Sequence, residues 1–422
     1  MFRDGFFVIF GIMKRMILTI AAALLMAGSV MAQPCCTGNC TDFHHIAFRG
    51  DLHHSFARMA EQKKATVAFL GGSITEMKGW HEMVEEDLRR RFPDTEFHFI
   101  EAGIGSLGST PHAFRMEADV LEKGTPDLMF VEAAVNDHTN RFGPVEQVRG
   151  MEGIVRHALK VNPEMDIVML HFIYDPFLPM LAEGVVPDVI LNHDRVANHY
   201  RLTSIDLASE ISERMADGQL TWEEFGGTHP APLGHRYYMD AIAKGFDANM
   251  PCLAAGASGA SAEGARVLPE PIDTLCYENG QYVPLENATA LKGFSLVPSW
   301  EPSVGASLRN GFHGVPMLSA DKAGASFRLK FEGRAIGLFM VAGPEAGIME
   351  YRVDKGDWKR IDPFTEWSRG LYIPWVYMLE TELAPGTHEL QLKVADGGAT
   401  TLGDGSTVRR TSCHIRNFVV NR

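Results

Sequence analysis

A serine and a histidine, each on a glycine-rich turn, are the first residues of this sequence that could do chemistry together. Ser73 stands in the segment GGSIT directly after an apolar run at 65–70, and His229 stands in GGTHP much later in the chain. A serine on such a turn is exposed and can act as a nucleophile when a histidine accepts its proton. Serine and glycine are also ordinary turn and helix-capping residues, so the turn by itself leaves a purely structural role open.

Two further segments could hold the negative charge that develops when an ester carbonyl is attacked. The loop AGIGSLGST at 102–110 consists mostly of small residues, which let backbone amides approach a substrate oxygen closely. Asn136 follows another apolar run, and its side-chain amide could donate one more hydrogen bond to that oxygen. The loop could also cradle a phosphate, but it has neither the Walker spacing nor its lysine.

The elements around these residues predict a parallel sheet. Short apolar runs at 65–70, 97–100, 127–135 and 166–173 predict strands, and helical patterns lie between them. This alternation is typical of a doubly wound α/β domain. Ligands bind beyond the carboxyl ends of the strands in such a sheet, and the serine and the asparagine fall there.

Length and composition indicate a globular chain of more than one domain. The chain has 422 residues, of which 45% are apolar and 22% charged, and its formal net charge is −14. The acidic balance argues against nucleic-acid binding, which needs a positive surface. Short alternating runs near the C-terminus predict an antiparallel β-sandwich or jelly roll. We predict a signal peptide at 1–32 and an N-terminal extension at 33–62. A catalytic domain at 63–250, an Ala/Gly/Ser linker at 251–269 and a β-sandwich at 270–422 follow.

The N-terminus has the pattern of an export signal. Lys14 and Arg15 precede an apolar stretch at 16–32 that ends in small residues and is too short to cross a bilayer comfortably. A membrane anchor is the alternative, but no stop-transfer pattern follows. We therefore expect a secreted or periplasmic protein, with no stable membrane insertion once the signal is removed.

Six cysteines would remain after export, and an even count in an oxidising compartment permits disulfides. The pairing cannot be deduced from the sequence, but Cys276 and Cys413 could link the terminal strands of the last domain. The cluster CCTGNC at 35–40 lies near His44 and His45, so a metal site is conceivable, but a second spaced pair of ligands is missing. The predicted chemistry needs neither a metal nor a cofactor.

Four segments in this order, GGSIT, AGIGS, AVND and THP, resemble the sequence blocks of the SGNH hydrolase family, also called GDSL-like esterases. The resemblance covers about residues 63–250 and implies a flavodoxin-like sheet and the hydrolysis or transfer of acyl esters. It implies that Ser73 is the nucleophile and His229 the catalytic base. It further implies an oxyanion hole made by the backbone of Ser73, by that of Gly105 or Ser106, and by the side chain of Asn136.

Two departures from the family pattern bear on the mechanism. Gly72 stands where the first block commonly has an aspartate, and Gly226 stands where the family usually has the triad aspartate. The second departure is the more serious, because an orienting carboxylate fixes the imidazole tautomer and stabilises the imidazolium. Glu224 could replace that carboxylate, a backbone carbonyl could hold the ring in a serine–histidine dyad, or Glu224 could be a solvated loop acid.

Together these features predict an exported serine esterase that removes small acyl groups, acetyl above all, from a carbohydrate through an acyl-enzyme. The last domain has a cluster of aromatic residues that could stack on sugar rings or could form the sandwich core and interdomain packing, namely Trp358, Trp367, Tyr372, Trp375 and Tyr377. The alternatives are a lipid acylhydrolase or acyltransferase with the same serine, and a glycan-binding protein on a decayed esterase scaffold. The acidic net charge favours a neutral or modestly charged glycan.

Overall fold

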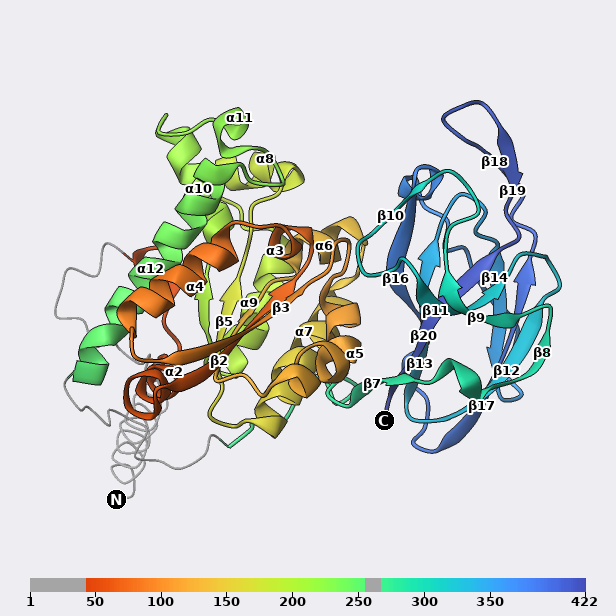
Figure 1. Ribbon diagram of the computed structural model, residues 1–422, viewed down its shortest axis with the longest axis horizontal. Coiled ribbons are helices and arrows are strands. Elements are labelled where there is room, and N and C mark those ends of the chain that lie inside the picture. Colours follow the sequence, from red (N-terminus) through yellow and green to blue (C-terminus); the bar gives the residue numbers. More distant parts are fainter. Residues whose placement is uncertain (1–42, 255–266) are drawn as a thin grey trace, which may run out of the picture.

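The computed structural model describes residues 43–254 and 267–422, which form an α/β domain followed by an all-β domain (Figure 1). The predicted fold class of both parts is confirmed. The predicted signal peptide, the cysteine cluster at 35–40 and most of the predicted linker lie outside the described residues. Within the two described ranges, no helix combines the length and the apolar character needed to cross a membrane.

Six strands form the sheet of the α/β domain, namely β1 (Ile46–Ala47), β2 (Lys64–Gly71), β3 (Glu96–Gly103), β4 (Leu128–Val131), β5 (Asp166–Leu170) and β6 (Thr203–Ile205). Their order is β1-β6-β5-β4-β2-β3, and every pair is parallel except that of β1 with β6. This is the flavodoxin-like order, because the chain leaves β2 for β3 on one side and then crosses back to β4 on the other. The carboxyl ends of β2 and β4 therefore flank a switch point, where open α/β sheets bind ligands.

Helices cover both faces of this sheet (Figure 1). The helices α4 (Trp80–Arg91) and α12 (Pro232–Ala254) pack on one face, and α5 (Ser109–Asp119), α7 (Pro144–Val161) and α9 (Asp188–His199) pack on the other. Alternate residues of β2 follow this division: Val67 and Phe69 belong to the first core and Ala68 and Leu70 to the second. The shorter helices are α2 (His53–Ala57), α3 (Ser73–Glu76), α6 (Ala134–Thr139), α8 (Leu178–Ala182), α10 (Leu207–Ala216) and α11 (Trp222–Phe225).

Two of the predicted strands are too long. The run predicted at 127–135 ends as β4 at Val131, and α6 begins at Ala134. The run predicted at 166–173 ends as β5 at Leu170. Both segments stay buried beyond the end of the strand, and apolar content alone does not separate a buried strand from a buried helix. The early end of β4 places Asn136 on a short helix at the edge of the sheet.

The all-β domain is a sandwich of two mainly antiparallel sheets, with an additional ribbon formed by β18 and β19. The first sheet has the order β10-β16-β13-β20-β11-β9, with β7 beside β20, and the second has the order β15-β14-β17-β12-β8. The strands are β7 (Gly280–Val283), β8 (Ala288–Lys292), β9 (Ser295–Trp300), β10 (Ser307–Leu308), β11 (Val315–Ala320), β12 (Ser326–Glu332), β13 (Ala335–Ala342), β14 (Ile348–Val353), β15 (Lys359–Ile361), β16 (Leu371–Glu380), β17 (Thr387–Ala395), β18 (Ala399–Thr401), β19 (Thr407–Arg409) and β20 (Cys413–Asn421).

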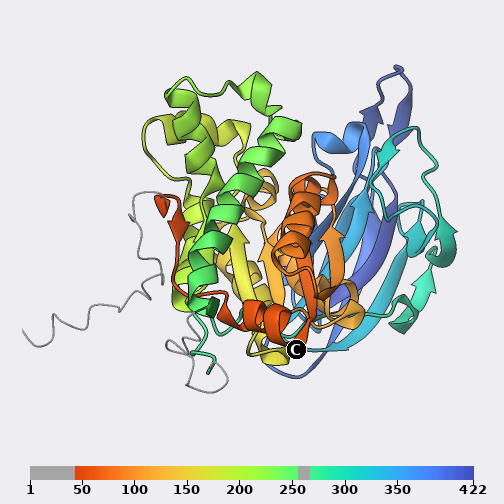
Figure 2. The same ribbon diagram turned by 60° about the vertical axis from the view of Figure 1, so that its left-hand side comes forward.

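The first sheet of the sandwich is buried on both faces. All eight residues of β13 are buried. Leu338 and Met340 face the core between the two sheets, whereas Phe339 and Val341 belong to the same core as α5 and α7 of the α/β domain. The turned view in Figure 2 shows the strands of the sandwich (blue) beside the α/β domain. The two domains therefore share a continuous apolar core, which fixes one against the other.

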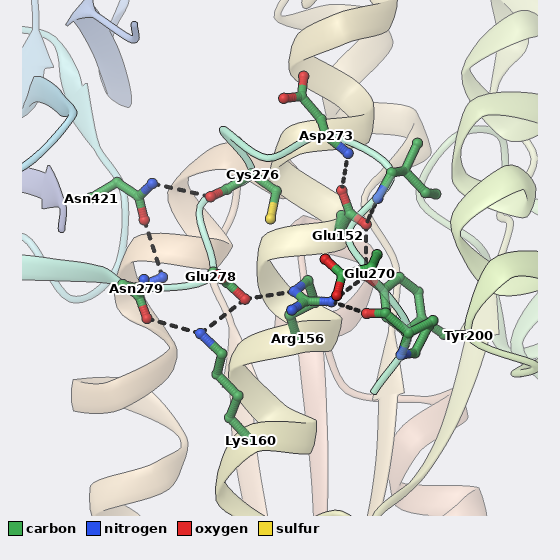
Figure 3. Close-up of polar contacts among 12 residues, drawn as sticks. Glu152, Arg156, Lys160, Tyr200, Glu270, Asp273, Cys276, Glu278, Asn279 and Asn421 are labelled. Carbon is green, nitrogen blue, oxygen red and sulfur yellow. Dashed lines mark hydrogen bonds and ion pairs between the residues drawn. The ribbon is translucent and has the colours of Figure 1, made fainter. Parts of the chain in front are cut away.

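Polar contacts around α7 anchor the start of the second domain (Figure 3). Glu152 accepts hydrogen bonds from the backbone N–H of Ile272 and Asp273 at 2.6 and 2.9 Å. Arg156 donates to the carboxylate of Glu278 at 2.5 Å. Gly153 lets this segment lie directly on the helix, because a Cβ there would come within 2.9 Å of the backbone of Tyr277. The segment from Pro269 to Glu278 is thus packed on α7.

The possible disulfide between Cys276 and Cys413 is not formed, since both are buried free thiols. Cys276 lies in the segment that packs on α7, whereas Cys413 begins β20 and faces the core of the sandwich. Burial raises the pKa of both thiols, that of Cys276 to about 12, so neither is a reactive thiolate at neutral pH.

Candidate active site

Ser73 and His229 meet at the switch point of the sheet. Ser73 is the first residue of α3, directly after β2, and His229 lies in the turn between α11 and α12. The Ser73 Oγ and His229 Nε2 atoms are 2.8 Å apart, which is the hydrogen-bond distance expected of a nucleophile and its general base. Partial burial lowers the pKa of His229, and the positive charge of Arg309 lowers it further. The imidazole is therefore mostly neutral at pH 6.5 and above and can accept the serine proton.

Three hydrogen-bond donors around Ser73 have no acceptor among the described residues. They are the backbone N–H of Ser73, the backbone N–H of Ser106 and the side-chain amide of Asn136, and all three residues line one pocket. Gly105 differs, because its N–H donates to the carboxylate of Glu76 at 2.9 Å. Of the two loop positions predicted for the oxyanion hole, Ser106 is thus the one whose N–H is free. Unsatisfied donors beside a nucleophile suit the oxygen that becomes negative during acyl transfer.

A buried carboxylate accepts hydrogen bonds from the turn that carries Ser73. Glu132 follows β4 and is only 2% exposed. It accepts hydrogen bonds from the N–H of Gly72 at 2.6 Å and from the hydroxyl of Thr75 at 3.2 Å. Burial raises the pKa of Glu132 to about 7, because the charged form loses its hydration. Glu132 is not among the predicted site residues, because the strand predicted at 127–135 runs through it. A charged residue inside an otherwise apolar run is the signal that points to it.

Comparison with known families decides what kind of domain this is. Residues 69–237, which contain Ser73, Ser106, Asn136 and His229, match the profile of the GDSL-like Lipase/Acylhydrolase family. This part of the chain is an SGNH hydrolase domain. The family predicted from the four sequence blocks is therefore confirmed, and with it the class of carboxylic ester hydrolases.

Two solved structures share the architecture of the whole chain. Both are of a two-domain esterase (CEX) described as active on acetylated mannans, one of them co-crystallised with mannopentaose. Each is 23% identical to this chain with a TM-score of 0.69, and the match covers 89% of this chain and 96% or 97% of the other. This likeness establishes the two-domain fold. No curated protein matches the chain.

The first departure from the SGNH pattern has a steric cause. A Cβ on Gly72 would lie 2.0 Å from Oδ1 of Asn136, so the asparagine amide occupies the space that a side chain at this position would need. Gly72 is therefore part of how this SGNH domain brings the amide of Asn136 next to Ser73.

The second departure also has a steric cause, and Glu224 does not replace the missing aspartate. Gly226 ends α11 with φ +103°, and a Cβ there would lie 2.1 Å from the backbone nitrogen of Ala231. Glu224 is exposed and accepts hydrogen bonds from both the N–H and the hydroxyl of Thr221, which form a capping box at the start of α11. Within the described part of the chain, no carboxylate or carbonyl oxygen hydrogen-bonds to Nδ1 of His229. Among the described residues, the side chain of His229 thus forms a hydrogen bond to Ser73 alone.

A pocket of about 340 Å³ opens at Ser73 and is lined from both domains. The SGNH domain contributes Ser73, Ser106, Val135, Asn136, Thr139, Asn140, Tyr174, Thr228 and His229. The sandwich contributes Arg309, Trp367, Leu371, Ile373 and Trp375. Trp367 is 50% exposed at the pocket, whereas Tyr372 is buried in the core shared by the two domains. Tyr372 therefore has the predicted packing role, and stacking on sugar rings stays a prediction. Arg309 carries no sequence signal, and the sequence analysis missed it.

Among the residues that the structure describes, two groups of side chains could hold a metal ion, and neither lines this pocket. They are His44, His45 and Glu213, and His81, Glu85 and Glu101. The first group borders a separate hollow of about 500 Å³, where His45 and Glu213 already form a hydrogen bond of 2.9 Å. Ester hydrolysis at Ser73 calls on neither group.

Proposed function

We propose that this SGNH hydrolase is an exported esterase that removes acetyl groups from carbohydrate by means of a serine–histidine dyad. The observation that carries the proposal is the 2.8 Å contact between Ser73 Oγ and His229 Nε2 beside three donors that have no protein acceptor. Export rests on the sequence of residues 1–32 alone.

The proposed reaction has two halves. In the first, Ser73 attacks the ester carbonyl while Nε2 of His229 takes the serine proton, and the same imidazolium then protonates the departing sugar hydroxyl. The backbone N–H groups of Ser73 and Ser106 and the side-chain amide of Asn136 hold the oxyanion. In the second half, His229 takes a proton from the water that attacks the acyl-enzyme. The imidazolium then returns this proton to Oγ of Ser73 as the acyl bond breaks and acetate leaves.

The absence of an orienting carboxylate changes the pH dependence. A carboxylate would raise the pKa of the imidazole, but here the pKa of His229 is lowered, first by burial and then by the charge of Arg309. His229 is the base in its neutral form, so kcat/KM should rise with pH through a midpoint below 6.5 and then stay level.

The choice of substrate rests on the second domain. Trp367 and Trp375 line the pocket, and flat aromatic faces suit the stacking of sugar rings. The two-domain esterase that shares this architecture is described as active on acetylated mannans. Acetylated mannan is therefore the first polysaccharide to test, with acetylated xylan beside it.

The test is acetate release from p-nitrophenyl acetate and from both polysaccharides. We expect S73A and H229A to lose at least 1,000-fold in kcat/KM, since the pair acts as a unit. The matched control is H313A, which changes an exposed histidine that hydrogen-bonds to Glu301 in the sandwich. Equal rates for wild type and S73A on every substrate would overturn the proposal.

A fluorophosphonate probe separates the remaining alternatives. An active serine–histidine pair labels at Ser73, whereas a binding protein on a decayed scaffold stays unlabelled. Release of fatty acid from phospholipid, or transfer of acetyl to an added sugar without net acetate release, would instead indicate the lipid acylhydrolase or the acyltransferase.

A further inference from the structure

The second domain places a cationic side chain on the loop that completes the oxyanion hole. Arg309 follows β10, and its Nε donates a hydrogen bond to Oγ of Ser106 at 3.2 Å. Its Nε also lies 3.3 Å from the position that a Cβ on Gly105 would take, so the guanidinium packs closely over this loop. No carboxylate among the described residues forms an ion pair with Arg309.

The sheet of the sandwich fixes where Arg309 stands. β10 pairs in parallel with β16, with Ser307 opposite Leu371 and Leu308 opposite Tyr372. Tyr372 is fully buried in the core shared by the two domains. Arg309 therefore directly follows a strand that pairs with a strand of the shared core, although it lies in a short connection.

Ser106 needs such support, because its backbone is in the left-handed region with φ +74°. A residue with a side chain adopts this conformation only where its surroundings impose it. Three contacts do so here. The amide of Asn140 donates to the Ser106 carbonyl at 3.1 Å, Glu76 accepts from the N–H of Gly105 at 2.9 Å, and Arg309 donates to the Ser106 hydroxyl.

We propose that Arg309 is a positioning residue that holds the N–H of Ser106 in the oxyanion hole, so that the second domain takes part in the chemical step even when the substrate is too small to be bound by it. The inference rests on the proposed esterase function and extends it, because it assigns the sandwich a role in kcat and not only in carbohydrate binding.

The charge of the guanidinium gives this role a readout that a purely structural contact lacks. Arg309 contributes to the lowered pKa of His229, after burial. The other titratable or charged groups near the imidazole are Tyr174 in the pocket, Glu76 behind the loop, and Glu223 and Glu224 on the adjoining helix α11. Removal of the guanidinium therefore raises the pKa of His229 and moves the acidic limb of kcat/KM to higher pH.

The test uses the full chain with p-nitrophenyl acetate, whose acyl group and leaving group carry no sugar. We expect R309M to lower kcat about 10- to 100-fold with KM within threefold, because a displacement of about 1 Å in a catalytic group costs up to about 100-fold. We expect the acidic limb to move to higher pH and fluorophosphonate labelling of Ser73 to slow in proportion to kcat.

Two further variants separate the hydrogen bond from the charge. R309K keeps the charge and loses the Nε donor, so it should lower kcat while keeping the acidic limb near that of wild type. S106A removes only the acceptor oxygen, so it too should lower kcat and keep the acidic limb near that of wild type. This variant tests the contact even if R309M is less stable. The matched control is R328M, which changes an exposed arginine on β12 of the outer sheet that pairs with Glu389 and should leave both readouts unchanged.

Wild-type kcat and an unmoved acidic limb in R309M would overturn the inference. A loss confined to KM on acetylated polysaccharide would also overturn it, because Arg309 would then only bind substrate. Failure of the proposed function is a different result, namely wild-type protein that neither hydrolyses p-nitrophenyl acetate nor reacts with the fluorophosphonate.

Discussion

The change Gly72→Ala tests whether the shape of the nucleophile turn serves catalysis. The added Cβ would lie 2.0 Å from Oδ1 of Asn136, and an ordinary contact begins near 3.4 Å, so the amide must move by about 1.4 Å. The backbone at Gly72 has φ −86°, which lies outside the left-handed region that favours glycine, so we expect the displaced amide to be the main effect. Loss of one oxyanion donor costs about 3 kcal/mol, or about 100-fold or more in kcat.

The assay is kcat on p-nitrophenyl acetate for G72A, N136A and the double variant. Each single change should lower kcat about 100-fold, and the double variant should be no worse than either, because the clash disappears with the amide. G143A is the matched control, since Gly143 has φ −75° and nothing within 4 Å of its added Cβ. A G72A variant with kcat near wild type, or a double variant that loses the product of both effects, would refute the reasoning.

Three other predictions concern carboxylates and thiols. The Glu224→Gln change should leave kcat/KM within twofold, because Glu224 is bound to Thr221 and not to His229; a loss above 10-fold in the hydrolysis assay would restore it as the triad acid. Glu132→Gln should flatten the pH dependence of stability. The pKa of Glu132 is raised to about 7, so the folded chain binds this proton more tightly than the unfolded chain does. The contribution of Glu132 to the free energy of unfolding should therefore fall by about 3 kcal/mol between pH 4.5 and 7.5. Urea titrations should show this fall in wild type and not in the variant. Cys276 and Cys413 should resist iodoacetamide until the protein is unfolded, and peptide mapping that finds them linked would contradict the free thiols.

Much of the catalytic domain was predictable because its signals are local. An apolar run followed at once by GGSIT marks β2 and the turn after it, and parallel strands bring their carboxyl ends to one edge whatever the loops between them do. The same rule placed Asn136 beside the serine, although the predicted strand before it was too long. Periodicity did not reveal where β4 gives way to α6, since both segments are buried.

The two departures from the family pattern show where local reasoning stops. Gly72 and Gly226 stand where the family pattern has aspartates, but in both places a side chain would clash. At Gly72 it would meet the amide of Asn136, which is distant in the sequence, and at Gly226 it would meet the backbone of Ala231 around a turn. Glu224 stands three residues after Thr221, which is the spacing of a capping box, and in the structure it forms that capping box at the start of α11.

The sequence by itself determined the chemical inventory: a serine, a histidine, an asparagine and a glycine-rich loop in the order of an SGNH hydrolase, followed by a β-rich domain. Tertiary structure alone decided that the second domain lines the pocket and that Arg309 touches Ser106, 203 residues earlier in the chain. The physical reason is that such a contact depends on how the two domains pack against each other. Both faces of β13 are apolar, and one face packs against the core that contains α5 and α7. This packing places the sandwich at the mouth of the active site.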